Sequence, residues 1–409
     1  MERVLQGVKV IEVSAWAFVP SAGAVLADWG AEVIKVEPPN GDPLRGLVNA
    51  GIGGAGGVSF PWEIWNRGKR SIALDLTKPE ARDIVLKLVA DADVFLTSYL
   101  PPTRRKLGLD IDDVRAANPS IVYACGTGQG AVGDEAEKGG YDSISFWARG
   151  GIGATVTPAG SERPIGQPVG AFGDSLSGMA LAGGVSAALL RRARTGEGAI
   201  VDGALLNTAM WCLQMSITGA AMMMATASPD SAPPSASAAN PAMFNPLVNN
   251  YKTADGRWVS LCMLQRDQYW SGVCVALGRD DLLTDERFAT PGALGDHNQD
   301  AIAELAQTIG AKPLAEVSAM LKSQRGQWDV MQNVLELPND PQAIANGFVQ
   351  QVSYGDLELP LVAAPAQFDR TPPPLGRAPE FGADTEAVLT DLGMDMDAII
   401  EAKLSGAVV

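Results

Sequence analysis

Short apolar runs alternate with helix-length segments through the first half of the chain. A run of about four to eight apolar residues bounded by polar or turn residues is typical of a buried strand. Such runs occur at 8–13, 32–36, 72–76, 94–97, 121–124 and 199–202. Segments with helix start and stop signals lie between them, for example Pro20 to Ala27, which Gly30 closes, and Pro79 to Ala90. This alternation predicts an α/β fold with a parallel, Rossmann-like sheet.

The pattern changes at residues 225–241, where Ser, Pro and Ala dominate. Such a composition cannot build a core and indicates a linker. Beyond it, Tyr251 to Val259 predicts a hairpin with an Asp-Gly turn, and helical segments follow. We therefore expect four parts: a large Rossmann-like domain over 1–224, a linker over 225–241, a smaller α+β domain over 242–328 and a C-terminal segment over 329–409.

Composition narrows the class of protein. The chain has 409 residues, 46% of them hydrophobic and 19% charged, which is typical of a globular enzyme. Its net charge of −16 argues against nucleic acid and anionic membrane surfaces as partners. No apolar stretch reaches the roughly 18 residues of a membrane span, and no signal peptide precedes the first strand-like run. The four cysteines form no C-x-x-C pair, so we expect neither a metal site nor disulfides, and a cytoplasmic location.

One carboxylate stands out. The segment Gly170 to Gly178 places Asp174 in a glycine-flanked turn directly before a long apolar run, Met179 to Leu190, which predicts a buried helix. Asp is a favoured N-cap residue, so Asp174 has a purely structural interpretation. The alternative is a reactive carboxylate on bare backbone, where glycines allow a bulky substrate to approach. The local sequence leaves both interpretations open.

Basic residues gather in two places near the ends of predicted strands. They are Arg67, Lys69 and Arg70 in one cluster and Arg104, Arg105 and Lys106 in the other. Open α/β sheets bind ligands at strand ends, so in an acidic chain these clusters indicate an anionic ligand such as a phosphorylated nucleotide. Solvated surface charge is the alternative. The single histidine, His297, lies in a polar stretch, which disfavours most mechanisms that depend on imidazole.

The glycine-rich stretch Gly51 to Gly56 matches G-x-G-x-x-G. A dinucleotide-binding fingerprint follows a strand and opens a helix, whereas this stretch leads into Phe60-Pro61-Trp62. We therefore expect a loop. A dehydrogenase would rest on this match alone and would require NAD binding.

Four blocks together resemble the class III CoA-transferase family, of the formyl-CoA transferase and carnitine-CoA transferase type. The blocks are LADWGAEVIKVEP at 26–38 with Gly41, Asp42 and Arg45; NRGKRSIALDL at 66–76; Gly173-Asp174-Ser175 with its helix, Thr195 to Gly198 and Val201-Asp202; and YKTADG at 251–256. They span most of the chain in the family's order. No single block is specific, but the set is.

The resemblance implies an enzyme with a two-domain α/β fold and an interlocked homodimer. The large domain would contain both chain ends, so segment 329–409 would return to it. In this family, the aspartate at the position of Asp174 attacks an acyl-CoA thioester, and CoA passes to a free carboxylic acid through aspartyl anhydride and thioester intermediates. Coenzyme A is then a substrate, and no metal or redox cofactor is required. Backbone N–H groups of glycine-rich turns are candidates to stabilise the oxyanions.

Some positions depart from the family's pattern. Phe18-Val19-Pro20 replaces the usual Ala-Gly-Pro, Ser98-Tyr99 replaces Asn-Phe, and Leu100 replaces an Arg. We expect Lys69 and Arg70 at the 3′-phosphate of CoA. The full set of residues expected to contact CoA is Val19, Lys69, Arg70, Ser98, Tyr99, Arg104, Lys106, Lys138 and Tyr141.

Two alternatives share the expected fold. The α-methylacyl-CoA racemases use a His-Asp pair, and the matching element here is Gly140-Tyr141-Asp142. Tyrosine, with an ordinary pKa near about 10, is a poor general base near pH 7, so racemase or epimerase activity is disfavoured. A non-catalytic acyl-CoA-binding protein is the other alternative, because a fold does not settle function.

Four aromatic residues bear on the acyl group. Trp16, Phe18, Trp62 and Trp65 are either core residues or the walls of an apolar acyl pocket. In the second case the acid is larger or more hydrophobic than formate or oxalate.

Overall fold

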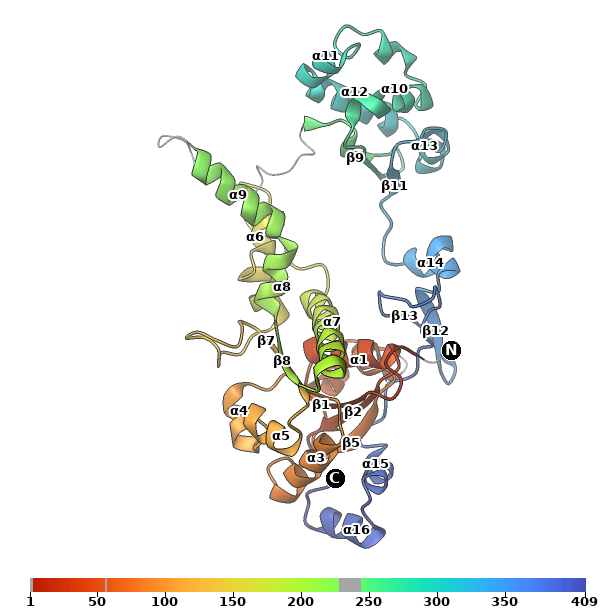
Figure 1. The fold of residues 1–409 in the computed structure, drawn as a ribbon. Helices are drawn as coiled ribbons and strands as arrows, with labels where there is room; N and C mark the ends of the chain where they lie inside the picture. Colours follow the sequence, from red (N-terminus) through yellow and green to blue (C-terminus); the bar gives the residue numbers. More distant parts are fainter. Residues whose placement is uncertain (1–2, 56, 228–243) are drawn as a thin grey trace. The chain divides into compact units, whose positions relative to one another are not determined.

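The computed structural model describes residues 3–55, 57–227 and 244–409. The chain divides into two compact units (Figure 1). The first combines Met1–Thr226 with Pro341–Val409, and the second is Ala227–Asp340. Most of the predicted linker, 225–241, lies outside the described residues.

A six-stranded sheet forms the centre of the first unit. Its strands are β1 (Lys9–Val13), β2 (Glu32–Glu37), β5 (Arg70–Ala73), β6 (Val94–Thr97), β7 (Val122–Thr127) and β8 (Ala199–Ala204). The order is β5-β2-β1-β6-β7-β8, and every neighbouring pair is parallel. This order confirms the predicted Rossmann-like sheet. Successive strands are added outward from β1 on one side of the sheet and from β6 on the other. The position between β1 and β6 is therefore a topological switch point, and ligands bind beyond the carboxyl ends of the strands at such a point.

The two faces of the sheet take alternate residues of each strand. Val10 and Val33 face one core, which they share with α1 (Phe18–Asp28) and α7 (Phe172–Thr195). Their neighbours face a second core, which contains residues of α3 (Pro79–Ala90), α5 (Ile111–Ala117), α15 (Thr385–Asp391) and α16 (Met396–Leu404). Both faces are buried, as the nearly continuous apolar strands predict.

The C-terminal segment closes onto the sheet. The backbone N–H of Val409 donates to the carbonyl of Ala73 at 3.1 Å, and Val408 bridges to Leu74. Segment 341–409 therefore belongs to the same unit as the N-terminal strands, as the resemblance implied. It also supplies α14 (Pro341–Ala345) and the hairpin of β12 (Val349–Tyr354) and β13 (Leu357–Val362).

Shorter elements connect the strands. They are η1 (Pro43–Ala50), the hairpin of β3 (Gly54–Ala55) and β4 (Val58–Ser59), α2 (Phe60–Asn66), α4 (Pro101–Leu107), the π-helix η2 (Asp142–Ala148), α6 (Ile152–Val156), α8 (Leu205–Cys212) and α9 (Gln214–Thr226). The G-x-G-x-x-G match follows a 3-10 helix and enters a hairpin rather than joining a parallel strand to a helix, so it lacks the context of a dinucleotide site.

Two glycines allow α7 to pack closely. A Cβ on Gly178 would lie 2.5 Å from Oγ of Ser21 in α1, and a Cβ on Gly173 would lie 2.2 Å from Phe146. No side chain fits in either place. The N-terminal turn of α7 is therefore held against α1 and η2 by backbone contact.

The second unit is a small α+β domain, as predicted. Its antiparallel sheet has the order β11-β10-β9. The elements are β9 (Val248–Lys252), β10 (Trp258–Cys262), α10 (Arg266–Ala276), η4 (Asp280–Leu283), α11 (Pro291–Asp296), α12 (Asn298–Gly310), α13 (Leu314–Leu321), β11 (Trp328–Val330) and η5 (Leu337–Asn339). The Asp255-Gly256 turn joins β9 to β10. The strand β11 pairs with β10, and the compact unit continues to Asp340.

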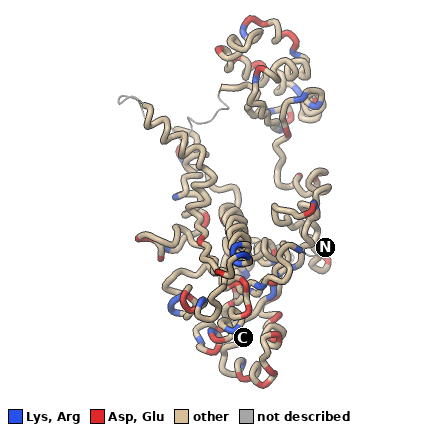
Figure 2. Tube along the Cα trace, in the orientation of Figure 1, with Lys and Arg blue, Asp and Glu red and all other residues tan. Residues whose placement is uncertain are grey.

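Lys and Arg residues are interspersed with Asp and Glu residues along the described chain (Figure 2). Within the described residues, no helix combines the length and apolarity needed to cross a membrane.

Candidate active site

A pocket of about 200 Å³ lies at the carboxyl ends of the central strands. Ala15 and Trp16 follow β1, Ser98 and Leu100 follow β6, and Gly126 to Gly128 end or follow β7. The remaining lining residues are Phe18, Gly139, Gly140, Tyr141, Asp174 and Leu205. The pocket therefore occupies the switch point of the sheet, where the strand order predicts a ligand.

Asp174 lies in the first turn of α7 but does not cap it. The N-cap position is Ala171, with φ 60°, and this residue makes no side-chain capping hydrogen bond. The carboxylate of Asp174 accepts no hydrogen bond from the described part of the chain. Burial, together with the smaller effect of the nearby charge of Asp142, raises its pKa to about 7. The structural interpretation of Asp174 as an N-cap is therefore not the arrangement found.

Asp142 supports the same turn. Its Oδ1 accepts a hydrogen bond from the backbone N–H of Gly173 at 3.1 Å. Burial raises the pKa of this carboxyl as well. Two carboxyl groups thus lie near each other, one bonded to backbone and the other, Asp174, open to the pocket.

Glycine backbone forms another part of the wall. A Cβ on Gly128 would lie 2.7 Å from Cα of Gly140, so the two segments touch as bare backbone. The N–H groups of Gly139 and Gly140 donate no hydrogen bond to any described residue. They are free to bind a ligand oxygen.

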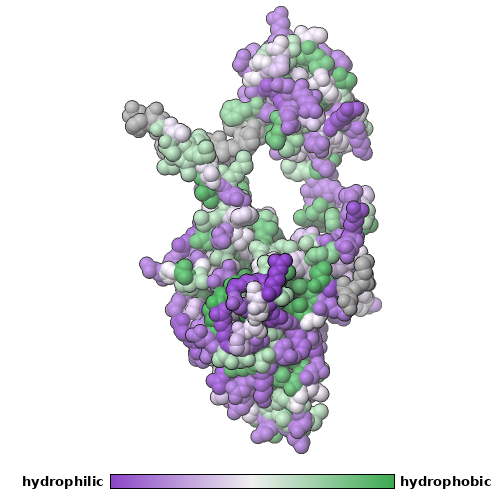
Figure 3. All heavy atoms as spheres, viewed as in Figure 1, coloured by the Kyte–Doolittle hydropathy of each residue, from purple (hydrophilic) through white to green (hydrophobic). Residues whose placement is uncertain are grey.

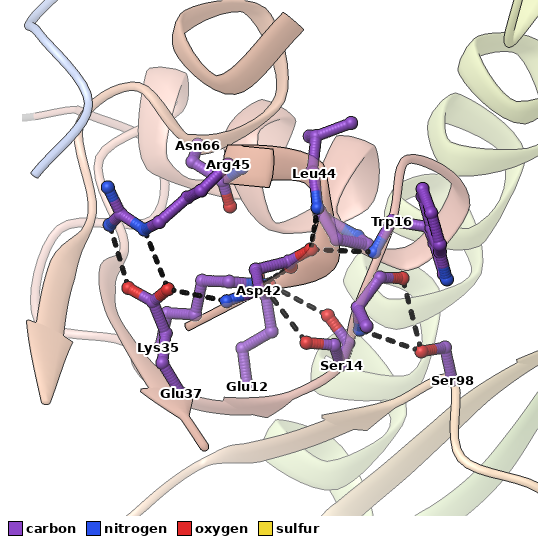
Figure 4. Close-up of polar contacts among 12 residues, drawn as sticks. Glu12, Ser14, Trp16, Lys35, Glu37, Asp42, Leu44, Arg45, Asn66 and Ser98 are labelled. Carbon is purple, nitrogen blue, oxygen red and sulfur yellow. Dashed lines mark hydrogen bonds and ion pairs between the residues drawn. The ribbon is translucent and has the colours of Figure 1, made fainter. Parts of the chain in front are cut away.

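Trp16 stands on a strained loop. It has φ 68°, a left-handed conformation that a bulky residue rarely adopts. Its N–H donates to Oδ1 of Asp42 at 3.2 Å, and Ala15 N–H donates to Oγ of Ser98 at 2.9 Å (Figure 4). The ring meets Tyr141 edge-on, with centroids 5.8 Å apart.

A fully buried ion-pair cluster lies beneath this loop (Figure 4). Lys35 Nζ lies 2.9 Å from Asp42 and 3.1 Å from Glu12, and Lys69 Nζ lies 2.8 Å from Glu12. Burial alone would raise the pKa of Glu12, but the two lysines hold it below its ordinary value. For Lys69 burial prevails over Glu12 and lowers the pKa to about 8.

The sequence carries a signal for this cluster in two charged strand residues. Glu12 and Lys35 are charged residues within buried apolar strands, and they stand opposite each other in the register of β1 and β2. Opposite charges at such positions indicate a buried pair, since neither could be buried alone.

The structure brings only part of the expected CoA-binding set to the pocket. Ser98 and Tyr141 line it. Lys69 is enclosed in the buried cluster. Arg70 begins β5, so it lies at the amino ends of the strands, where it pairs with Glu32 and Asp391. Neither cation of the predicted 3′-phosphate site is therefore offered at the pocket.

The other expected residues differ in exposure. Val19 is buried, Tyr99 packs against the core of the α3 face, and Arg104 is buried in an ion pair with Asp110. Lys106 and Lys138 are exposed and lie close in sequence to the lining residues Leu100 and Gly139.

Only two of the four aromatic candidates for the acyl pocket line it. Trp16 and Phe18 line the pocket. Trp62 is buried beneath Arg45, whose guanidinium lies 3.5 Å from the ring centroid. Trp65 donates to Oγ of Ser175 at 3.3 Å, beside Asp174 in sequence.

No group of side chains able to hold a metal ion occurs in residues 3–55, 57–227 and 244–409. His297 is exposed in the second unit and pairs with Asp300 at 2.9 Å.

Comparison with known proteins agrees at the level of sequence and of structure. The model of CoA-transferase family III matches residues 5–385. The (R)-2-hydroxy-4-methylpentanoate CoA-transferase of Clostridioides difficile is 32% identical over 99% of this chain and 99% of its own. The succinyl-CoA–D-citramalate CoA-transferase of Chloroflexus aurantiacus is 32% identical over 98% of each chain. The crystal structure of a CAIB/BAIF family protein from Brucella suis matches with a TM-score of 0.77 at 28% identity, covering 96% of this chain and 100% of that chain.

Proposed function

This chain belongs to CoA-transferase family III, and we propose that it moves CoA from an acyl-CoA thioester to a free carboxylic acid, with Asp174 as the covalent nucleophile. The observation that carries the proposal is the unpartnered carboxylate of Asp174 in the pocket at the switch point of the sheet. The names of the relatives include an apolar acid and a dicarboxylic acid. The similarity therefore supports the CoA transfer but does not identify which acid this chain uses.

The reaction proceeds in two mirrored halves. A carboxylate oxygen of Asp174 attacks the thioester carbonyl, the C–S bond breaks, and CoA leaves as a thiolate. The thiolate attacks the aspartyl carbonyl of the mixed anhydride and releases the donor acid as a carboxylate. The acceptor carboxylate then attacks the aspartyl thioester, and the freed thiolate takes up the acceptor's acyl group and restores Asp174. Each step exchanges one anion for another, so no proton transfer is needed.

The surroundings of Asp174 suit a nucleophile. A carboxylate without hydrogen bonds, held at a pKa of about 7 by burial, loses little solvation when it attacks. The free N–H groups of Gly139 and Gly140 lie in the same pocket and are placed to stabilise the oxyanion of a tetrahedral intermediate.

The exposed Lys106 and Lys138 are the cations we assign to the phosphates of CoA. Replacing both with Gln is expected to raise the KM for acyl-CoA about tenfold, because two solvent-exposed ion pairs together contribute on the order of 1.4 kcal/mol. The matched control is Lys87→Gln on α3, which is also exposed. An unchanged KM in the double variant would place the phosphates elsewhere.

We also propose that the protein acts as a homodimer. Helix α9 buries none of its residues, and its Met215, Met222 and Met224 are 84%, 64% and 65% exposed. Figure 3 shows the predominantly hydrophobic colouring of α9. An apolar helix of this kind needs a partner surface. Sedimentation at micromolar concentration is expected to give twice the chain mass of 42.7 kDa.

Trapping with hydroxylamine tests the chemistry directly. The protein incubated with acyl-CoA and hydroxylamine is expected to carry an aspartyl hydroxamate at residue 174, detected by peptide mass spectrometry. Asp174→Ala is expected to give no hydroxamate and to lose about 10⁴-fold or more in transferase rate, while still binding acyl-CoA. The exposed Asp112→Ala serves as the matched control.

The same assay separates the alternatives. Exchange of the α-hydrogen in deuterated water without an acceptor acid would indicate a racemase. Binding of acyl-CoA without release of thiol would indicate a non-catalytic binding protein. An active Asp174→Ala protein would refute the assignment of the nucleophile.

A further inference from the structure

The described walls of the pocket contain no lysine and no arginine. The buried cations beneath the Trp16 loop, Lys35 and Lys69, are already held by Asp42 and Glu12. A second carboxylate on the acyl chain would therefore enter a poorly solvated site beside Asp174 without a counter-charge. Like charges in such a place repel strongly, and the charge of Asp142 already raises the pKa of Asp174.

The same walls offer apolar surface to a ligand. Trp16 and Tyr141 are 37% and 58% exposed and form an edge-to-face pair. Phe18 and Leu205 add two buried apolar side chains to the lining. Exposed aromatic rings that meet edge-on present a broad hydrophobic face, and covering such a face is favourable.

The position of Trp16 is fixed by the structure beneath it. Its left-handed backbone costs free energy, on the order of 1–3 kcal/mol for a residue in such a region. The hydrogen bond from the Trp16 N–H to Asp42 stabilises this conformation, and Lys35 fixes Asp42 by an ion pair. A large ring kept in a strained conformation at the edge of a pocket indicates selection for the ring's position.

We propose that Trp16 and Tyr141 form an acyl-selecting wall, and that the acyl groups transferred are bulky, apolar and uncharged, derived from monocarboxylic rather than dicarboxylic acids. The proposal rests on the function proposed above, because the pocket is taken as the acyl site. Tyr141 thereby has a role in substrate choice in addition to any contact with CoA. Trp16 and Tyr141 are specificity-determining residues, and Asp42 is a positioning residue.

The test uses the first half-reaction alone, so that no acceptor need be known. The full-length enzyme is given 4-methylpentanoyl-CoA, 3-phenylpropanoyl-CoA, succinyl-CoA or glutaryl-CoA with hydroxylamine, and thiol release and hydroxamate at Asp174 are measured. We expect kcat/KM for the two apolar thioesters to exceed that for the two acidic ones by about 100-fold or more. Equal rates would overturn the proposal while leaving the transferase function intact. No thiol release from any thioester would count against the function itself.

Variants of the wall sharpen the test. Trp16→Ala is expected to lower kcat/KM for the apolar thioesters about tenfold or more, and Trp16→Phe, the matched control, to retain most of it. Tyr141→Arg supplies a cation and is expected to improve use of succinyl-CoA, whereas Tyr141→Phe is not. If Trp16→Ala fails to fold, the two Tyr141 variants provide the test. An equal ratio of kcat/KM for succinyl-CoA to that for the apolar thioesters in Tyr141→Arg and Tyr141→Phe would overturn the proposal.

Discussion

Two sets of buried acidic side chains lie within the first unit, and they differ in what surrounds them. Glu12 is enclosed with Lys35 and Lys69, and these partners hold its pKa below the ordinary value despite complete burial. Asp174 has no cation and no hydrogen bond among the described residues, and burial raises its pKa to about 7. The first arrangement holds the loop of Trp16 through Asp42, and the second leaves a carboxylate open to the pocket, as the proposed nucleophile requires. Burial of a carboxyl group therefore says little about its role until its partners are known.

The largest difference between the two sets is expected when Lys35, the central cation of the buried cluster, is removed. Lys35→Met leaves Glu12 and Asp42 with a single lysine between them, and breaking a buried pair costs about 3–5 kcal/mol. We expect that loss in the free energy of unfolding, measured with urea at pH 7.5. Lys9→Met, which removes only an exposed pair with Asp91, is the control and is expected to cost under about 1 kcal/mol. Equal losses would show that burial adds nothing to the cluster.

Replacing Asp174 is expected to change the free energy of unfolding in the opposite direction. Asp174→Asn removes a carboxyl whose folded-state pKa is raised, so the substitution is expected to stabilise the protein by about 1–2 kcal/mol at pH 8 while abolishing activity. The wild-type carboxyl contributes its full stability below the unfolded pKa near 3.8 and loses it as pH rises through about 7. The difference in the free energy of unfolding between Asp174→Asn and wild type should therefore shrink as pH falls from 8 to 5. A destabilised variant at pH 8 would contradict the environment described for Asp174.

The smallest effect concerns the coupling between the two active-site carboxyls. Because the ionised form of Asp174 is the proposed nucleophile, kcat/KM is expected to rise about 30-fold from pH 5.5 to pH 8 and to level off above pH 7. Asp142→Asn removes the neighbouring charge and should move this acid limb to lower pH, while Asp112→Asn should leave it in place. An unmoved limb in Asp142→Asn would mean that burial alone sets the pKa.

Much of the fold could be predicted from the sequence. The alternating apolar runs identified the parallel strands, and the Asp-Gly turn identified the hairpin of the second unit. The expected boundary at 328 falls on the first residue of β11, whose pairing with the distant β10 leaves no local pattern in the sequence.

The candidate site could be predicted only in part. Asp174 stood out because glycines surround it, and the structure explains those glycines by close backbone packing at Gly173 and Gly178. Lys69 and Arg70 looked equally available to a phosphate in the sequence, yet one is enclosed by carboxylates and the other lies at the opposite end of its sheet. Lys69 precedes β5, whereas Arg70 is its first residue, so adjacency in sequence does not predict a shared site.

The sequence by itself determined the strand pattern, the acidic balance and the carboxylate at the start of a buried helix, because these depend on residue type and local spacing. Only the tertiary structure decided which charges are paired and which face the pocket. Solvation and Coulomb interactions depend on distance in space, and contacts such as that of Trp16 with Asp42 or Tyr141 join segments far apart in the chain.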